Sequence, residues 1–438
     1  HPLLRKNGEL TQVSWEEALT FAADRLKASG KKVLSLFSGN LSLEDMFAVK
    51  TLMAGLGGTT SLYNRMGGGE WVTRVGLFPG SDLAKLEKGS AILVFASDLH
   101  EEAPIWWLRV KQAAERGVTL VVAGTRKTRL DKFATHQVAY KFGDEEKALR
   151  EIFEGNSEIT RSITGAENLV VFMGSDGLGL EQTTSLAGAF AEKLVKGAHF
   201  GKVNNGLVVV WPHSNDQGAF ELRIMPEPKL ADAMSAAMGL YILGADPALD
   251  PNLKNAIQKA GFVIVQDLFM SETAKLADVV LPAQAVAERD GTLVSGERRA
   301  QRYAAAIPAP KETRADFAIT SSLIQKTLGT ELPATAGELF DLLCQEENVF
   351  SGLSFEKLGS IREQWPLMGR NDIYYGGTSY ENTFGIGVTL PLATGEIGMP
   401  RKTQTPDLVK TAKGQFLVVP VTRLYDQSPK VQTSLLRD

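Results

Sequence analysis

The sequence is poor in the side chains that most often hold metals. It has one cysteine, Cys344, and five histidines, at His1, His100, His136, His199 and His213. A single cysteine excludes a disulfide framework, and it excludes an iron–sulfur cluster or zinc site held by cysteines of this chain alone. The histidines lack the HxxH and HExxH spacings of zinc sites. We therefore expect no metal site within these 438 residues.

The sequence also lacks a block of one charge and a long apolar run. Its 47 Lys and Arg against 51 Asp and Glu leave a net charge of −4, which provides no basic field for nucleic acid. No apolar run is long enough to span a bilayer, and the first residues do not have the layout of a signal peptide. We expect a protein that binds no nucleic acid and does not insert directly into a membrane.

The stretch from 239 to 301 is the most informative part of the chain. It has three apolar runs, Leu240–Leu243, Phe262–Val265 and Val279–Leu281, separated by helix-length segments. Continuous rather than alternating apolar residues are typical of parallel strands covered on both faces, so a βαβαβ unit is predicted. Ligands of such sheets lie outside the carboxyl ends of the strands. Those ends carry Asp246 and Asp267, which become candidate site residues.

A second region, 65–200, repeats the strand-plus-helix pattern four times. Its predicted strands are 91–96, 119–123, 136–141 and 169–173, which together indicate a Rossmann-like domain. A helix is predicted at Arg126–Phe133. Gly174 opens a glycine-rich turn that leads toward a helix N-terminus, an arrangement that can bind anions. One more strand is predicted at 206–211, and residues 215–227 are predicted to be a loop.

The two ends of the chain indicate a piece of a longer polypeptide. The first residues, HPLLRKNGEL, begin without Met, and we expect sequence to precede them. Residues 330–410 are rich in Gly, Pro, Thr and Asn and are predicted to link or cap the domains. The run Gln415–Val421 is predicted to be a strand that opens a further β-rich domain.

Several segments resemble the family of molybdopterin-dependent oxidoreductases that includes formate dehydrogenases and nitrate reductases. They are HPLLRKNGELTQVSWEEAL, LVFASDLHEEAP, VTLVVAGTRKTRLDKFATHQV, GADPALDP, VQDLFMSETAKLADVVLPA and ERDGTLVSGERRAQ. The resemblance covers about 1–325, and FLVVPVTRLYDQSP is similar to the opening of the family's C-terminal β-barrel domain.

The resemblance implies the α/β fold of the family's second and third domains. This fold has two Rossmann-like parallel-sheet domains, one inserted in the other. The implied division is a discontinuous domain of 1–64 plus 203–330, an inserted domain of 65–202, a linking or capping region of 331–410, and the start of a truncated β-rich domain at 411–438.

Three departures from the pattern of active members concern the cofactor. Active members place Cys, selenocysteine or Ser near the loop that here contains Met66, and a thioether is a poor ligand for a hard, high-valent metal. Where the family's Asn-Pro turn meets phosphate, this chain has Asp98, Glu101 and Glu102, which would repel a pyrophosphate. The family's Asp-Pro-Arg reads Gly-Thr-Arg here, which keeps Arg126 and loses the acidic residue.

Within the family, these departures make the chain similar to the catalytically silent version in the large iron–sulfur subunit of NADH:quinone oxidoreductase. This similarity implies a structural role, no catalytic residue and no cofactor here, with iron–sulfur clusters in a part N-terminal to this chain. The implied partners are other subunits of the peripheral arm, and the implied location is cytoplasmic, peripheral to the inner membrane through the complex. The residues of a relic cofactor cleft would be Asp98, Glu101, Arg126, Gly174, Asp246 and Asp267.

Two other functions remain open. One is an active oxidoreductase that binds molybdopterin guanine dinucleotide, like a formate dehydrogenase; the other is an emptied cleft that binds another nucleotide or an anion. Some of these residues also allow a second interpretation. Arg126 can bind phosphate or can lie in a solvated first turn of a helix. Asp267 and Ser271 can bind a nucleotide or can cap the N-terminus of a helix. We expect 297–299 to be a charged surface and Trp106 to pack in the core or between domains.

Overall fold

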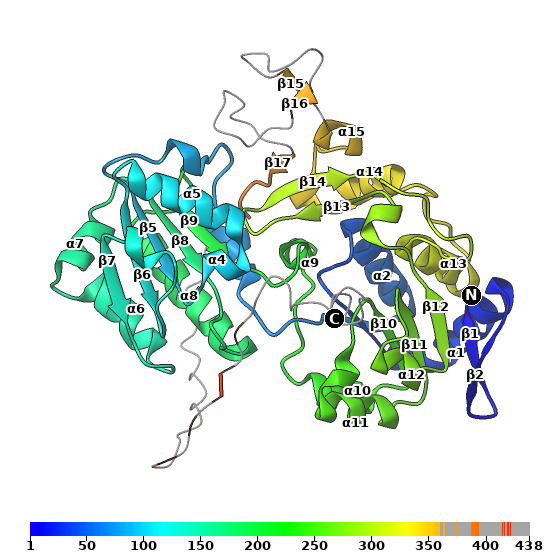
Figure 1. Ribbon diagram of the computed structural model, residues 1–438. Helices are drawn as coiled ribbons and strands as arrows, with labels where there is room; N and C mark the ends of the chain where they lie inside the picture. The colour runs from blue at the N-terminus through cyan, green and yellow to red at the C-terminus, as the bar shows by residue number, and fades with distance from the viewer. Residues whose placement is uncertain are drawn as a thin grey trace.

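The computed structural model describes residues 1–359, 362–363, 373–374 and 387–393, with single positions between 414 and 421. The strand expected at Gln415–Val421 and the β-rich domain expected at 411–438 therefore lie almost wholly outside the described residues. In the described part, two sheets lie side by side (Figure 1). No helix of that part is long and apolar enough to cross a bilayer.

The larger sheet contains the predicted βαβαβ unit. Its seven strands are β1 (Leu3–Lys6), β2 (Glu9–Gln12), β3 (Val33–Phe37), β4 (Thr59–Leu62), β10 (Gly239–Leu243), β11 (Val263–Asp267) and β12 (Val279–Pro282). They lie in the order β2-β1-β12-β11-β10-β3-β4. All pairs from β12 to β4 are parallel, and β1 joins β12 antiparallel with Leu3 opposite Val280. β3, β10 and β11 are buried along their whole length, as their apolar runs predict.

Helices cover both faces of the larger sheet. On one face, Tyr241, Leu243 and Ile264 share a core with α1 (Trp15–Ser29), α2 (Leu43–Leu56) and α13 (Asp316–Leu328). On the other face, Leu240 and Ile242 pack with α10 (Leu230–Ala236), α11 (Pro251–Lys259) and α12 (Glu272–Leu276). The sheet with these helices is called the larger-sheet unit below.

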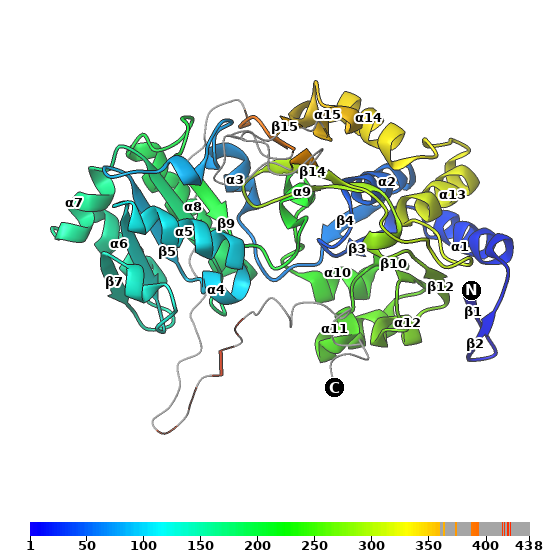
Figure 2. The ribbon, with the colours of Figure 1, turned by 45° about the horizontal axis from the view of Figure 1, so that its top comes forward.

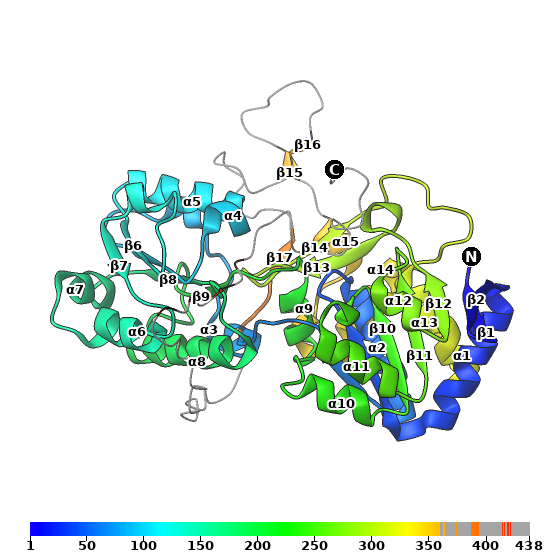
Figure 3. The ribbon, with the colours of Figure 1, turned by 60° about the horizontal axis from the view of Figure 1, so that its bottom comes forward.

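The smaller sheet is entirely parallel. Its strands are β5 (Ala91–Phe95), β6 (Thr119–Gly124), β7 (His136–Ala139), β8 (Leu169–Met173) and β9 (Gly206–Val209), in the order β7-β6-β5-β8-β9. Figure 3 shows α4 (Leu99–Glu102) and α5 (Pro104–Glu115) on one face and α6 (Glu145–Glu154) and α8 (Leu180–Lys196) on the other. α7 (Glu158–Thr164) and α3 (Gly69–Val75) also pack on the second face. This is the smaller-sheet unit.

Three predictions for this region are wrong. The strand near 206–211 was placed with 203–330, but β9 pairs with β8 in the smaller sheet, with Leu207 opposite Val171. The predicted loop 215–227 contains α9 (Asp216–Glu221), whose six residues are all buried. The helix predicted at Arg126–Phe133 is a bend and a short 3₁₀ turn at Asp131–Phe133. The first two errors involve tertiary pairing or burial, which a local pattern does not contain. In the third, the N–H and hydroxyl of Thr128 donate to Asp131 in a local turn.

A small antiparallel sheet packs against the core of the larger-sheet unit and turns its hairpin end toward the smaller-sheet unit (Figure 2). It is formed by β13 (Gly291–Val294), β14 (Arg299–Tyr303) and β17 (Val388–Thr389). Helices α14 (Ala336–Glu346) and α15 (Phe355–Leu358) lie beside it, and β15 (Arg362–Glu363) and β16 (Ile373–Tyr374) pair with each other. The charged surface predicted at 297–299 is wrong for Arg298, which is fully buried in the turn of the β13–β14 hairpin.

Candidate site at the carboxyl ends of the two sheets

The larger sheet and the smaller sheet each have one point, called the switch point, where the strand order reverses. In the larger sheet it lies between β3 and β10, since β4 continues on one side and β11 and β12 on the other. In the smaller sheet it lies between β5 and β8 for the same reason. Ligands of open α/β sheets bind outside the carboxyl ends of strands at such switch points. These two places are therefore the candidate sites.

At the larger-sheet switch point, the start of α9 occupies the space next to β3. A Cβ atom on Gly39 would lie 1.9 Å from the Oδ1 atom of Asp216, so only glycine fits there. The backbone N–H of Asn215 donates to the carbonyl of Gly39 at 2.8 Å, and its side-chain Nδ2 donates to the carbonyl of Leu41 at 2.8 Å. Asn215 and Asp216 are completely buried. The chain thus places its own polar groups beside the end of this strand.

Asp246 holds the segment after β10 against α12. Its carboxylate accepts hydrogen bonds from the backbone N–H groups of Glu272 (3.2 Å) and Thr273 (2.8 Å) and from the Thr273 hydroxyl (2.6 Å). Ser271 accepts from the N–H of Ala274 at 3.2 Å, which confirms the capping alternative for Ser271. Asp267, 8% exposed, accepts from the N–H of Leu268 at 2.7 Å. The carboxylate of Asp246 thus satisfies helix N–H groups.

At the smaller-sheet switch point, Arg126 is held between two aspartates. Its Nη1 atom lies 2.9 Å from Oδ2 of Asp98, and its Nε atom lies 3.4 Å from Oδ1 of Asp176. The Thr125 hydroxyl donates to Asp176 at 2.5 Å. Both aspartate side chains are 8% exposed, whereas that of Arg126 is 38% exposed. Asp98 and Arg126 were predicted from the sequence. Asp176 was not, although its place just after the β8 strand could have indicated it.

Glu102 adds a third carboxylate to this group. It accepts a hydrogen bond from the Ser97 hydroxyl and another from the Asp98 backbone N–H at 3.1 Å. Burial raises the pKa of Glu102 to about 7 against the effect of the Ser97 bond, and the charges of Asp176 and Asp98 add to the rise. Glu101, named from the sequence, instead contacts Nδ1 of His100 at 3.3 Å. Of the two predicted glutamates, Glu102 thus joins the group around Asp98, whereas Glu101 contacts His100.

Gly174 brings the ends of β5 and β8 together. A Cβ atom there would lie 2.4 Å from the Ala96 carbonyl oxygen and 2.8 Å from the Cβ of Ser97. The Gly174 N–H donates to the Phe95 carbonyl at 3.0 Å. The glycine is required by this close approach of backbone to backbone.

The loop at 66–69, where the resemblance implies a metal ligand in active members, is packed into the core here. Met66 is 4% exposed and belongs to the hydrophobic core between the smaller sheet and α8. A Cβ on Gly67 would lie 2.0 Å from the Thr184 hydroxyl, one on Gly68 2.3 Å from Ala187, and one on Gly69 2.2 Å from the Phe220 ring. Among the described residues, no three His, Cys, Asp or Glu side chains are grouped to hold a metal. These residues do not fit a molybdenum ligand set.

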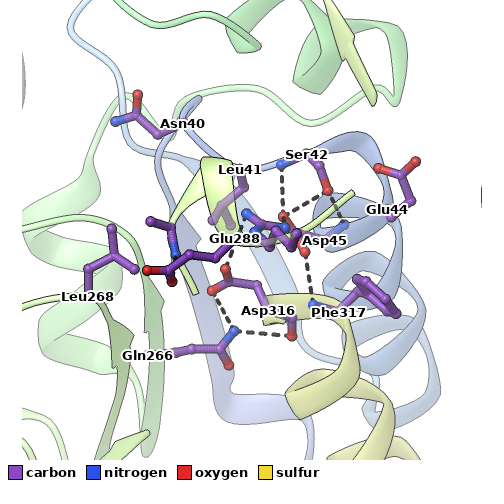
Figure 4. Close-up of polar contacts among 12 residues, drawn as sticks. Asn40, Leu41, Ser42, Glu44, Asp45, Gln266, Leu268, Glu288, Asp316 and Phe317 are labelled. Carbon is purple, nitrogen blue, oxygen red and sulfur yellow. Dashed lines mark hydrogen bonds and ion pairs between the residues drawn. The ribbon is translucent and has the colours of Figure 1, made fainter. Parts of the chain in front are cut away.

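A further polar cluster, which was not predicted from the sequence, lies beside β11 of the larger sheet (Figure 4). Arg289 pairs with Asp45 at 2.5 Å and with Asp316 at 3.2 Å. Asp45 also accepts from the backbone N–H of Phe317 at 2.8 Å, and Gln266 donates to Asp316 at 2.7 Å. All of these side chains are buried. The cluster joins α2, α13, β11 and the start of the β13–β14 hairpin, which is a structural arrangement.

Comparison with known proteins agrees with this architecture. The sequence profile of the Molybdopterin oxidoreductase family matches residues 1–326. Acetylene hydratase from Pelobacter acetylenicus has a similar structure, with a TM-score of 0.60 and 15% identity, covering 81% of this chain and 64% of that chain. At this identity the likeness concerns the fold alone, and with the family match it confirms the predicted fold class.

Two kinds of relative share the sequence. The F420-dependent formate dehydrogenase 2 subunit alpha of Methanococcus maripaludis is 26% identical, over 83% of this chain and 68% of its own length. A subunit of the NADH-quinone oxidoreductase of Rickettsia felis is 28% identical, over 74% of this chain and 46% of its own length. The chain thus spans about two thirds of the first relative and less than half of the second. The profile match over most of its length shows that this chain belongs to the molybdopterin oxidoreductase family.

Proposed function

We propose that this chain is a structural, catalytically silent region of the iron–sulfur subunit of an NADH:quinone oxidoreductase. The observation that carries the proposal is the occupation of both switch points by the chain's own groups. Asp216 lies against Gly39 in the larger sheet, and Arg126 is bound by Asp98 and Asp176 in the smaller one. A dinucleotide would have to displace buried hydrogen-bonded carboxylates, at the cost of leaving them unpaired.

The packed Met66 loop supports the same proposal. An active site of this family needs a thiolate or alkoxide at the metal, and the buried thioether of Met66 supplies neither. The NADH-quinone oxidoreductase relatives of three Rickettsia species support the assignment to that complex. The chain would support NADH-to-quinone electron transfer by the complex while no electron passes through these residues. Its partners would be other subunits of the peripheral arm, and iron–sulfur clusters would lie in a part of the polypeptide outside this chain.

The test uses the native full-length protein that contains this chain. Affinity purification from detergent-solubilised membranes should recover it together with NADH dehydrogenase activity, and Asp98→Asn with Asp176→Asn should not change the turnover of the assembled complex. Recovery without NADH dehydrogenase activity, or loss of turnover in the assembled variant, would overturn the proposal.

The second candidate function is an active formate-dehydrogenase-like oxidoreductase with a molybdopterin guanine dinucleotide. It is favoured by the formate dehydrogenase alpha relatives, which match a larger share of this chain than two of the three Rickettsia relatives do. Metal analysis of the same purified protein, with fluorescence of the oxidised pterin, separates the two functions. Molybdenum or tungsten at about one equivalent would establish the second function and exclude the first.

A further inference from the structure

The turn of the β13–β14 hairpin contains the largest fully buried side chain of the described residues, Arg298. Its backbone φ is +60°, a conformation that non-glycine residues adopt uncommonly. Its guanidinium forms a bidentate pair with Glu221, with Nε–Oε1 at 2.7 Å and Nη2–Oε2 at 2.9 Å. It also donates to the carbonyls of Pro391 at 2.9 Å and Leu390 at 3.4 Å. Charge-assisted hydrogen bonds of a buried arginine are strong and directional, so Arg298 fixes the segments that supply its acceptor oxygens, at Glu221 and at 390–391.

The segments around Arg298 are the two crossings between the units. The chain leaves the larger sheet after β4 and reaches β5 by way of α3, and it returns from β9 through α9. On the outgoing crossing, a Cβ on Gly76 would lie 2.8 Å from the Cδ atom of Arg298. On the returning crossing, Glu221 binds the guanidinium. Gly76 also forms a parallel bridge with Leu207, so the outgoing crossing lies beside β9, the strand from which the returning crossing starts.

The hydrogen-bonded groups continue from Glu221 into the smaller-sheet unit. Gln217 donates to Glu221 at 2.9 Å, and the indole N–H of Trp211 donates to Gln217 at 3.1 Å. The same hairpin turn makes a second contact with that unit, where Trp106 of α5 donates to Glu297 at 2.6 Å. Trp106 thus packs between the units, as expected. The hairpin itself is bound to the larger-sheet unit through Thr292, whose N–H and hydroxyl both donate to Glu44 of α2 at 2.9 Å.

We propose that Arg298 and Glu221 are positioning residues that fix the orientation of the smaller-sheet unit relative to the larger-sheet unit. Two units joined by two crossings move relative to each other unless an interface holds them. The pair binds the returning crossing, at Glu221, to a hairpin whose Val294 and Ala300 pack in the core of the larger-sheet unit. The side chain of Arg298 also lies against the outgoing crossing at Gly76. The carboxyl ends of the two sheets keep their relative orientation because of this pair. The inference does not depend on the proposed function, since it concerns the arrangement of the units alone.

The experiment measures the distance between the units in the whole chain. Spin labels are attached to Arg150→Cys on α6 and Asn255→Cys on α11, both exposed, while the buried Cys344 stays unlabelled. Pulsed electron paramagnetic resonance gives the distance distribution for the unsubstituted pair, for Arg298→Met and for Glu221→Gln. Arg289→Met is the matched control, because it breaks another buried arginine–carboxylate pair that lies wholly within the larger-sheet unit.

We expect Arg298→Met and Glu221→Gln to shift and broaden the distribution of distances between the spin labels. Arg289→Met should lower the melting temperature but leave the distance distribution as narrow as in the unsubstituted pair. If Arg298→Met does not fold, the milder Glu221→Gln decides, since it keeps the shape and one acceptor of the side chain. The inference would be overturned if the folded Arg298→Met and Glu221→Gln variants gave distance distributions as narrow as that of the unsubstituted chain. It would also be overturned if Arg289→Met broadened the distribution as much as they do. Neither outcome would bear on whether the chain belongs to an NADH:quinone oxidoreductase.

Discussion

Gly69 begins α3 at a position where the ring of Phe220 leaves no room for a side chain. A Cβ there would lie 2.2 Å from the ring, which stacks on Trp211 at a centroid distance of 5.2 Å. Gly69→Ala must therefore displace a ring that packs between α3 and α9. We expect the free energy of unfolding to fall by about 1–3 kcal/mol, the usual cost of overpacking, and thermal unfolding measures it.

Gly124→Ala is the matched control for that substitution. Gly124 ends β6, its φ is not left-handed, and a Cβ there would meet its nearest atom at 3.5 Å, an ordinary contact. The control should melt at nearly the temperature of the unsubstituted protein. If both alanine variants melt together, the loop at 67–69 is not packed as described, and the space beside Met66 is larger than these contacts indicate.

The side chain of Asp246 distinguishes a structural cleft from a binding cleft. Because its carboxylate satisfies two N–H groups and a buried hydroxyl, Asp246→Ala should lower the free energy of unfolding by about 2 kcal/mol, at the upper end for a lost N-cap. Asp246→Asn, which keeps one acceptor oxygen, should lose less. Urea unfolding measures both variants. Unchanged stability in Asp246→Ala would show that the carboxylate is available for a ligand.

The sequence predicted which residues lie at the strand ends but not what they contact. Asp98, Arg126 and Asp246 stand shortly after apolar runs, so their placement follows from the strand pattern. The pairing of Arg126 with Asp176 joins residues that are 50 positions apart. The pair of Asp45 with Arg289 spans 244 positions. Contacts of this kind depend on how the elements pack in three dimensions, and a single sequence contains no local signal for them.

At the scale of elements, α2 and β13 are joined through a buried carboxyl group. Glu44 is completely buried and accepts both hydrogen bonds from Thr292. Burial is the main cause that raises the pKa of Glu44 from 4.5 to about 7. The folded chain therefore holds this proton to a higher pH than the unfolded chain does. Its contribution to stability is present below pH 4.5 and is lost as the pH rises toward 7.

Glu44→Gln should remove this pH dependence. The neutral amide keeps the size of the side chain and an acceptor for Thr292, and it has no proton to lose. Relative to the unsubstituted protein, the variant should gain about 3 kcal/mol in free energy of unfolding between pH 4.5 and pH 8, by the linkage of pKa to stability. Urea unfolding at several pH values measures the difference. A constant difference across this range would mean that the pKa of Glu44 is not raised in the folded protein.

The buried strands were predicted correctly from the sequence, whereas the short helix α9 was not. Runs such as 91–96 and 169–173 are apolar, bounded by turns and buried on both faces, so they were recognised from the sequence. The short helix α9 was predicted as a loop because prolines, Pro226 and Pro228, punctuate the end of this segment. Its burial depends on Gly218, where a Cβ would lie 2.1 Å from Asn215 and 2.9 Å from Leu43 of α2. Such a helix is specified by its tertiary contacts.

At the scale of the whole molecule, the chain forms part of the larger sheet, then the smaller sheet, and then returns to the larger one. We propose that the inserted domain folds by itself, with an end beyond the predicted residue 202. Both hydrophobic cores of the smaller sheet are formed by residues between Met66 and Trp211. The segment after 202 contributes Leu207 and Val209 to one core and Val208 and Val210 to the other.

This division predicts a difference between two excised fragments. Residues 66–212 contain every member of both cores and should unfold cooperatively on heating. Residues 66–202 lack four fully or almost fully buried side chains, worth about 6–12 kcal/mol at the usual 1.5–3 kcal/mol each. That loss equals the stability of a typical domain. The shorter fragment should therefore show no cooperative transition by circular dichroism. If it unfolds as cooperatively as the longer one, β9 is not needed in the smaller sheet, and the boundary predicted from the sequence is the better one.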